Sequence, residues 1–122
     1  MAGRWTLTLR NGPHFQRLHF DSLLGAMTAL EQRLDELAPH AKREAIGVFK
    51  RQFDPVRQVV VRAEISGPGG WRAPRGGVDL RGDGSAESYT GRLRRRVVKL
   101  RADESPYEGL RRELEEGQRT VR

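Results

Sequence analysis

Hydrophobic residues occupy every second position from Trp5 to Leu9, with polar residues between them. This two-residue period is typical of a β-strand with one buried face. Asn11-Gly12 follows, a pair that readily adopts the positive φ of a tight hairpin turn. The pattern therefore predicts an N-terminal β-hairpin whose return strand covers residues 15–20.

An apolar residue then recurs every three or four positions from Leu23 to Leu37, which is the spacing of one face of an α-helix. Asp21 or Ser22 can cap the first free backbone amides. Proline does not continue a helix readily. We therefore predict a helix over 22–38 that ends before Pro39.

Two further strands are predicted after this helix. The apolar residues of 44–53 and the Asp54-Pro55 turn behind them predict the first. Residues 57–65 alternate more regularly and turn four apolar side chains to one face: Val59, Val61, Ala63 and Ile65. The two strands are expected to pair antiparallel and to pack on the helix.

The segment 66–77 is rich in glycine and proline and has no hydrophobic period, which predicts a mobile loop. Residues 78–81 and 86–89 flank a Gly-Asp-Gly-Ser turn and predict a short hairpin. Residues 92–101 are predicted to extend the last strand with Val97 facing inward, and a helix is the alternative for this stretch.

A second helix closes the chain. Ser105 and Glu108 have the spacing of a capping box, and Pro106 takes the first helical position. Gly117 is predicted to end this helix. The remaining residues, 118–122, are predicted to be a frayed tail.

Together these elements predict an α+β fold with a single two-layer domain over residues 1–117. The domain has an antiparallel sheet of five or six strands, one long helix on a face of the sheet and a C-terminal helix. That last helix is expected at an edge of the sheet or against a partner. The order helix, three strands, helix resembles the double-stranded-RNA-binding domain in order alone. The resemblance would imply a lysine cluster at the start of the last helix, where this chain has Ser105-Pro106-Tyr107-Glu108, so no family is assigned.

Composition excludes several classes of protein. The 122 residues include no cysteine, so a disulfide framework, a thiolate metal site and a cysteine nucleophile are all ruled out. No apolar run approaches the roughly 18 residues that a membrane span needs. Residues 1–10 lack the pattern of a signal peptide. The expectation is a cytoplasmic protein without membrane contact.

The net charge of +7 changes the picture, because the excess is concentrated in residues 41–101. Only three of the 23 basic residues are lysines. Arginine can grip a phosphate group with two hydrogen bonds, whereas lysine offers a point charge. A GC-rich genome would produce the same preference for arginine, so both explanations stay open.

Two segments carry candidate nucleic-acid-binding residues. On a strand, Arg92, Arg94 and Arg96 would share one face, where they could follow a phosphate backbone or keep a sheet edge soluble. In the glycine-rich loop, Trp71 could stack on a base or fold back over the core. The predicted nucleic-acid-binding residues are Arg57, Arg62, Trp71, Arg72, Arg75, Arg92, Arg94 and Arg96.

No catalytic or metal site is predicted. His14, His19 and His40 have no carboxylate or cysteine at a metal-ligand spacing. Serines and glycine-rich stretches match neither a nucleophile elbow nor a phosphate-binding fingerprint. We therefore expect a chain that is not an enzyme and that uses no cofactor.

The leading hypothesis is a small basic accessory protein that binds DNA or RNA through arginine–phosphate contacts, largely independently of sequence. The alternative is a protein-interaction or homo-oligomerisation module without enzymatic activity. It arises because a single helix layer would leave several apolar residues of the predicted strands exposed: Phe15, Phe49, Phe53, Val60 and Val98.

Overall fold

The chain folds around one sheet. The structure is a computed structural model that describes residues 4–49, 59–91 and 94–120. Within those residues the elements are, in chain order, β1 (Trp5–Asn11), β2 (His14–Phe20), α1 (Leu23–Phe49), β3 (Val59–Ser66), a 3-10 turn (Gly70–Arg72), β4 (Arg75–Arg81), β5 (Ala86–Thr90), β6 (Arg96–Val97) and α2 (Pro106–Thr120).

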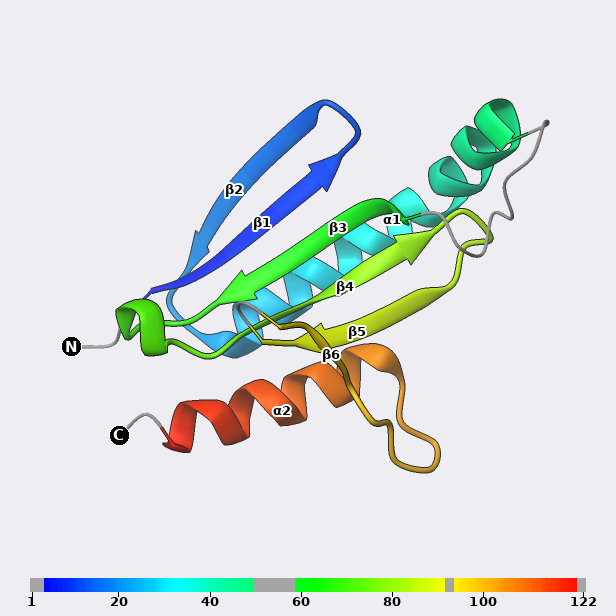
Figure 1. The fold of residues 1–122 in the computed structure, drawn as a ribbon. Helices are drawn as coiled ribbons and strands as arrows, with labels where there is room; N and C mark the ends of the chain where they lie inside the picture. The colour runs from blue at the N-terminus through cyan, green and yellow to red at the C-terminus, as the bar shows by residue number, and fades with distance from the viewer. Residues whose placement is uncertain (1–3, 50–58, 92–93, 121–122) are drawn as a thin grey trace.

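The strands form a six-stranded sheet in the order β2-β1-β3-β4-β5-β6 (Figure 1). Every neighbouring pair is antiparallel. The predicted N-terminal hairpin is confirmed, with Gly12 at a φ of 60° in its turn, and it forms one edge of the sheet. The predicted α+β fold with a long helix and a C-terminal helix is confirmed as well.

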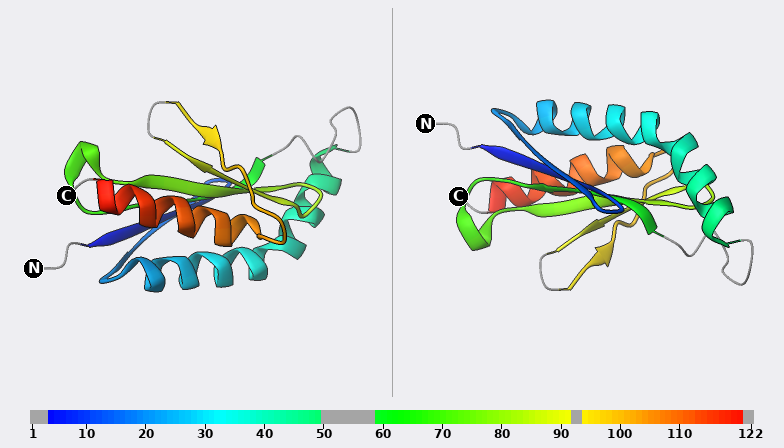
Figure 2. Two further views of the ribbon diagram at one scale, coloured as in Figure 1. Left: turned by 90° about the horizontal axis from the view of Figure 1, so that it is seen from below. Right: turned by 90° about the horizontal axis from the view of Figure 1, so that it is seen from above.

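Both helices cover the same face of the sheet (Figure 2). α1 packs on β3 and its neighbours, and α2 packs on β4 and β5. We call this side the helix face and the other side the open face, since no described helix covers it. The core between sheet and helices includes Trp5, Leu7, Leu9, Leu30, Leu34, Val61, Ala63, Ile65, Val78, Leu80, Leu110 and Leu114.

α1 continues through Pro39 to Phe49. The predicted end of the helix before Pro39 is therefore wrong, and so is the strand predicted over 44–53 as far as residue 49; residues 50–53 lie outside the described part. Proline removes one helical hydrogen bond and usually bends a helix, and α1 changes direction along its second half (Figure 2). The alanine, lysine, arginine and glutamate residues of 41–45 favour continuation of the helix.

The loop predicted over 66–77 is shorter in the structure. Ser66 still belongs to β3, and β4 already begins at Arg75. The Gly67 N–H donates to the Pro74 carbonyl at 2.9 Å and closes the connection. A Cβ on Gly67 would lie 2.8 Å from the Trp5 ring, so the core itself selects glycine there.

The end of the chain departs from the prediction in two ways. The strand predicted over 92–101 is reduced to Arg96–Val97. Val97 is 63% exposed while Val98 is buried, so the inward face is the opposite of the predicted one. The capping box before α2 is confirmed by hydrogen bonds in both directions between Ser105 and Glu108. Gly117 does not end α2, which runs on to Thr120.

Candidate nucleic-acid interface

The open face is built from the side chains that alternate with the buried ones along the strands. In the register of the sheet, one row across this face consists of Phe15, Arg10, Arg62, Asp79 and Glu87. The next row consists of Arg17, Thr8, Glu64, Gly77 and Tyr89. The open face is therefore polar, and arginine is its most frequent charged residue.

Three carboxylates neutralise the centre of the open face. Arg62 donates to both carboxylate oxygens of Asp79, from Nε at 2.8 Å and from Nη2 at 3.3 Å. This contact raises the pKa of Arg62, since the hydrogen bond to Asp79 stabilises the charged guanidinium. The other pairs are Arg75 with Glu64 at 3.4 Å and Arg81 with Glu87 at 2.7 Å.

Tyr89 lies beside this centre and is only 4% exposed. Its hydroxyl donates to Glu64 Oε2 at 3.4 Å, and the guanidinium carbon of Arg95 stands 4.7 Å from the ring centroid. Burial, and the negative charge of Glu64, raise the pKa of the Tyr89 phenol. Tyr89 is thus held neutral under an arginine that comes from the β5–β6 hairpin.

At the opposite edge of the sheet, Phe15 is 54% exposed. The guanidinium carbon of Arg10 lies 5.9 Å from its centroid, and that of Arg17 lies 5.6 Å from it. No carboxylate of the described residues forms an ion pair with either arginine. A hollow of about 250 Å³ adjoins this cluster, lined by Arg10, Gly12, Val59, Val60 and Arg62.

A third pairing of arginine with an aromatic ring stands at the end of the sheet. Trp71 is 74% exposed, and the guanidinium carbon of Arg72 lies 5.8 Å from its ring. Both views in Figure 2 place the Gly70–Arg72 turn and β6 on the side of the sheet away from the helices. The two projections therefore flank the open face.

The structure brings together part of the set that the sequence predicted. Arg62 and Arg75 lie on the open face but are paired with carboxylates, while Trp71 and Arg72 stand exposed at its end. Arg96 lines a hollow of about 340 Å³ together with Glu113 and Glu116 of α2, on the helix face.

The structure describes one of the other three predicted arginines. Arg94 is exposed in the β5–β6 hairpin. Arg57 and Arg92 lie outside the described residues. Of the predicted row on one strand face, Arg96 lies in a strand and Arg94 does not, since β6 covers only Arg96–Val97, and Arg92 is not described.

Sequence reasoning missed Arg10, Arg17 and Arg95 as candidate site residues. The two-residue period of the strands predicts the outward direction of the first two. Arg10 is out of phase with Trp5, Leu7 and Leu9, and Arg17 is out of phase with Leu18 and Phe20, so both face away from the core. The contact of Arg95 with Tyr89 depends on the turn geometry of a hairpin that the pattern did not predict.

Charge is distributed unequally between the two sides of the molecule. The strands place five arginines and three carboxylates on the open face, whereas residues 23–39 and 106–120 of the helices carry four arginines and seven carboxylates. The open face is therefore more positive than these two helix segments.

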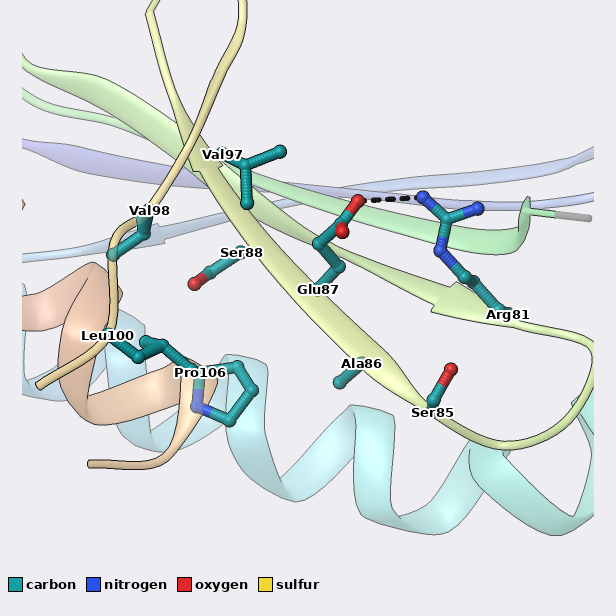
Figure 3. Close-up of a pocket in the computed structure, with 9 residues that line it drawn as sticks. All are labelled: Arg81, Ser85, Ala86, Glu87, Ser88, Val97, Val98, Leu100 and Pro106. Carbon is teal, nitrogen blue, oxygen red and sulfur yellow. Dashed lines mark hydrogen bonds and ion pairs between the residues drawn. The ribbon is translucent and has the colours of Figure 1, made fainter. Parts of the chain in front are cut away.

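A cavity of about 540 Å³ opens between β5 and the segment that leads from β6 to α2 (Figure 3). Ala86, Val98, Leu100 and Pro106 give it an apolar lining. Ser88 Oγ is buried there without a hydrogen-bond partner. Arg81 and Glu87 at the rim pair with each other.

The described residues contain no cluster of histidine and carboxylate side chains that could hold a metal ion. None of the helices in the described part of the chain is long and apolar enough to cross a membrane.

The protein is thus a small α+β protein with a six-stranded antiparallel sheet. Two helices cover one face of the sheet, and the open face presents arginine side chains. Comparisons with protein-family models, with curated proteins and with solved structures find no match to this chain. The functional conclusion therefore depends on the geometry alone.

Proposed function

We propose that the protein binds nucleic acid, DNA or RNA, on the open face of its sheet, mainly through arginine–phosphate contacts. One observation carries this proposal: Arg10, Arg17, Arg72 and Arg95 contact aromatic rings on or beside the open face, without a carboxylate partner among the described residues. Such guanidinium groups keep donors available for phosphate oxygens.

Binding of this kind is largely independent of sequence, because phosphate contacts carry no base information. The paired arginines, Arg62 and Arg75, contribute less than their number suggests, since Asp79 and Glu64 already occupy their donors. The acidic helices orient the protein with the open face toward the ligand. We propose further that the protein acts in the cytoplasm as an accessory protein without enzymatic activity.

A titration with labelled single-stranded and double-stranded DNA and RNA at two salt concentrations tests the proposal. We expect dissociation constants in the micromolar range or below at low salt. Affinity should fall by roughly 0.7–0.9 log units per log unit of salt for each phosphate engaged. Absence of binding to every one of these ligands at low salt would overturn the proposal.

A second candidate function is self-association. β6 pairs only with Tyr89 and Thr90, so the first residues of β5 have no strand partner on their outer side within the described chain. Val97 and Leu100 are exposed beside this edge, at 63% and 42%. An uncovered edge with apolar neighbours favours strand pairing with a second copy.

Light scattering coupled to chromatography separates the two candidates. A dimer that is lost in Leu100→Ser and that shows no affinity for polyanions supports self-association. A monomer that binds polyanions supports the first proposal.

A further inference from the structure

The geometry points to a single-stranded ligand, with one unstacked base lying on the Phe15 ring and an adjoining phosphate in the hollow between Arg10 and Arg62. This inference rests on the proposed function and adds the class of nucleic acid to it. Two independent features of the open face carry it: the exposure of Phe15, and the direct cross-strand pairing of Arg10 with Arg62.

Phe15 is placed as a stacking platform. It belongs to β2, the outermost strand of the sheet, and pairs in register with Arg10 of β1. Arg17 follows two residues later and so lies on the same face. Phe15 as a residue is 54% exposed, although both guanidinium carbons stand within 6 Å of its ring centroid. An exposed aromatic residue with two cations beside it can receive a base on its ring while the cations hold the flanking phosphates.

The hollow beside Phe15 has the charge for one phosphate. Arg10 and Arg62 are direct cross-strand partners of β1 and β3, and like charges placed opposite each other destabilise a sheet. Asp79 compensates Arg62 only. A phosphate lying between Arg10 and Arg62 would relieve the remaining repulsion.

The hollow is large enough to admit a phosphate group. Its volume is about 250 Å³. At its rim, Gly12 has a φ of 60° and no atom within 4 Å of the position where a Cβ would be. The backbone of the β1–β2 turn therefore leaves room for a ligand to approach.

A duplex does not fit this arrangement as well as a single strand does. In a duplex the faces of the bases are covered by their neighbours in the stack, so none is available to Phe15 without unstacking. Unpaired nucleotides can turn a base outward onto an aromatic ring while the backbone follows the cations. The chemistry selected is thus a flexible single strand, DNA or RNA, with little preference among bases.

Phe15→Leu is the variant that tests the inference, with Phe15→Trp as its matched control. Fluorescence anisotropy is measured at low salt with a labelled oligothymidine of about 12 nucleotides and with a duplex hairpin of the same charge. Phe15→Leu should weaken binding of the single strand by roughly 5- to 100-fold and change duplex binding less than about twofold. Phe15→Trp should retain or increase single-strand affinity, and unchanged far-UV circular dichroism verifies the fold of both variants.

The outcomes separate this inference from the proposed function. If wild type binds both ligands and Phe15→Leu weakens neither, or weakens both equally, the stacking site is refuted and the phosphate-based function remains. If wild type binds neither ligand, the proposed function fails together with the inference. A selective loss of the single strand in Phe15→Leu that Phe15→Trp restores supports both.

Discussion

Replacing Asp79 with asparagine keeps the side-chain size but removes the charge that holds the Arg62 guanidinium on the open face. The freed guanidinium can then turn to a phosphate. We expect Asp79→Asn to bind nucleic acid more tightly than the wild type although its fold is less stable. Opposite effects on binding and stability would be difficult to explain if Arg62 lay outside the interface.

The size of both effects follows from the structure. Each additional phosphate contact adds about 0.7 to the salt slope for a single strand. If wild type and variant bind equally at about 1 M salt, a slope that is steeper by about 0.7 makes the variant bind roughly fivefold more tightly at about 0.1 M salt. The side chains of Arg62 and Asp79 are 35% and 11% exposed, which places the pair between exposed and buried ion pairs. We therefore expect Asp79→Asn to lower the free energy of unfolding by about 1–3 kcal/mol.

The assay is a salt series of oligothymidine titrations, combined with urea unfolding. Glu115→Gln is the matched control, since it frees Arg111 by the same change of charge on an exposed pair of α2. The control should leave the salt slope unchanged within error. Equal affinity and equal slope for Asp79→Asn and Glu115→Gln would refute the placement of the interface on the open face.

Three further predictions concern the fold. Leu30→Ala removes a fully buried side chain of α1 and should lower the free energy of unfolding by about 2–5 kcal/mol in urea denaturation. Ser105→Ala removes the cap of α2 and should cost about 1 kcal/mol in the same measurement; no loss would contradict the capping box. The hydrogen bonds from Arg112 lower the pKa of Glu104 from 4.5 to about 2, so the stabilising contribution of Glu104 is complete above about pH 4.5 and is lost as pH falls through 2. Thermal melting of Glu104→Gln should accordingly show a smaller change between pH 5 and 2 than the wild type does.

The layers of the fold were predictable because the apolar residues that recur regularly in the strands and in the first half of α1 are also the residues that are buried. Leu7, Leu9, Val61 and Ile65 alternate in the sequence and are buried in the structure. Pro39 was misleading for a physical reason: a proline inside a helix removes one hydrogen bond, and strong helix formers on its C-terminal side can offset that loss. The strand predicted behind it was therefore wrong as far as residue 49.

The electrostatics of the open face could not be predicted from the sequence. Arg62 and Asp79 are 17 residues apart, and their contact requires the register of β3 against β4, which includes an irregularity between Val59 and Val61. Composition counts Arg62 and Arg75 as free positive charges, whereas the folded chain pairs both of them with carboxylates. The cations of an interface can be counted only after such pairs are known.

The outward direction of Phe15 and of its two arginine partners was within reach of the sequence, whereas the contact between Phe15 and Arg10 was not. In the predicted return strand, Phe15 is out of phase with Leu18 and Phe20, which pack against the core. The two-residue period of a strand therefore predicts that Phe15 faces outward. The two arginines that flank the ring come from different strands, and only the pairing of β1 with β2 brings them together.

Mapping of backbone amide shifts by NMR, as oligothymidine is added to the protein, tests the location of binding most directly. We expect the largest shifts in β1, β2 and β3, around Arg10, Phe15 and Arg62, and small shifts along the outer surface of α1. Shifts concentrated on the helices, or no shifts at saturating ligand and low salt, would contradict a ligand surface on the uncovered side of the sheet.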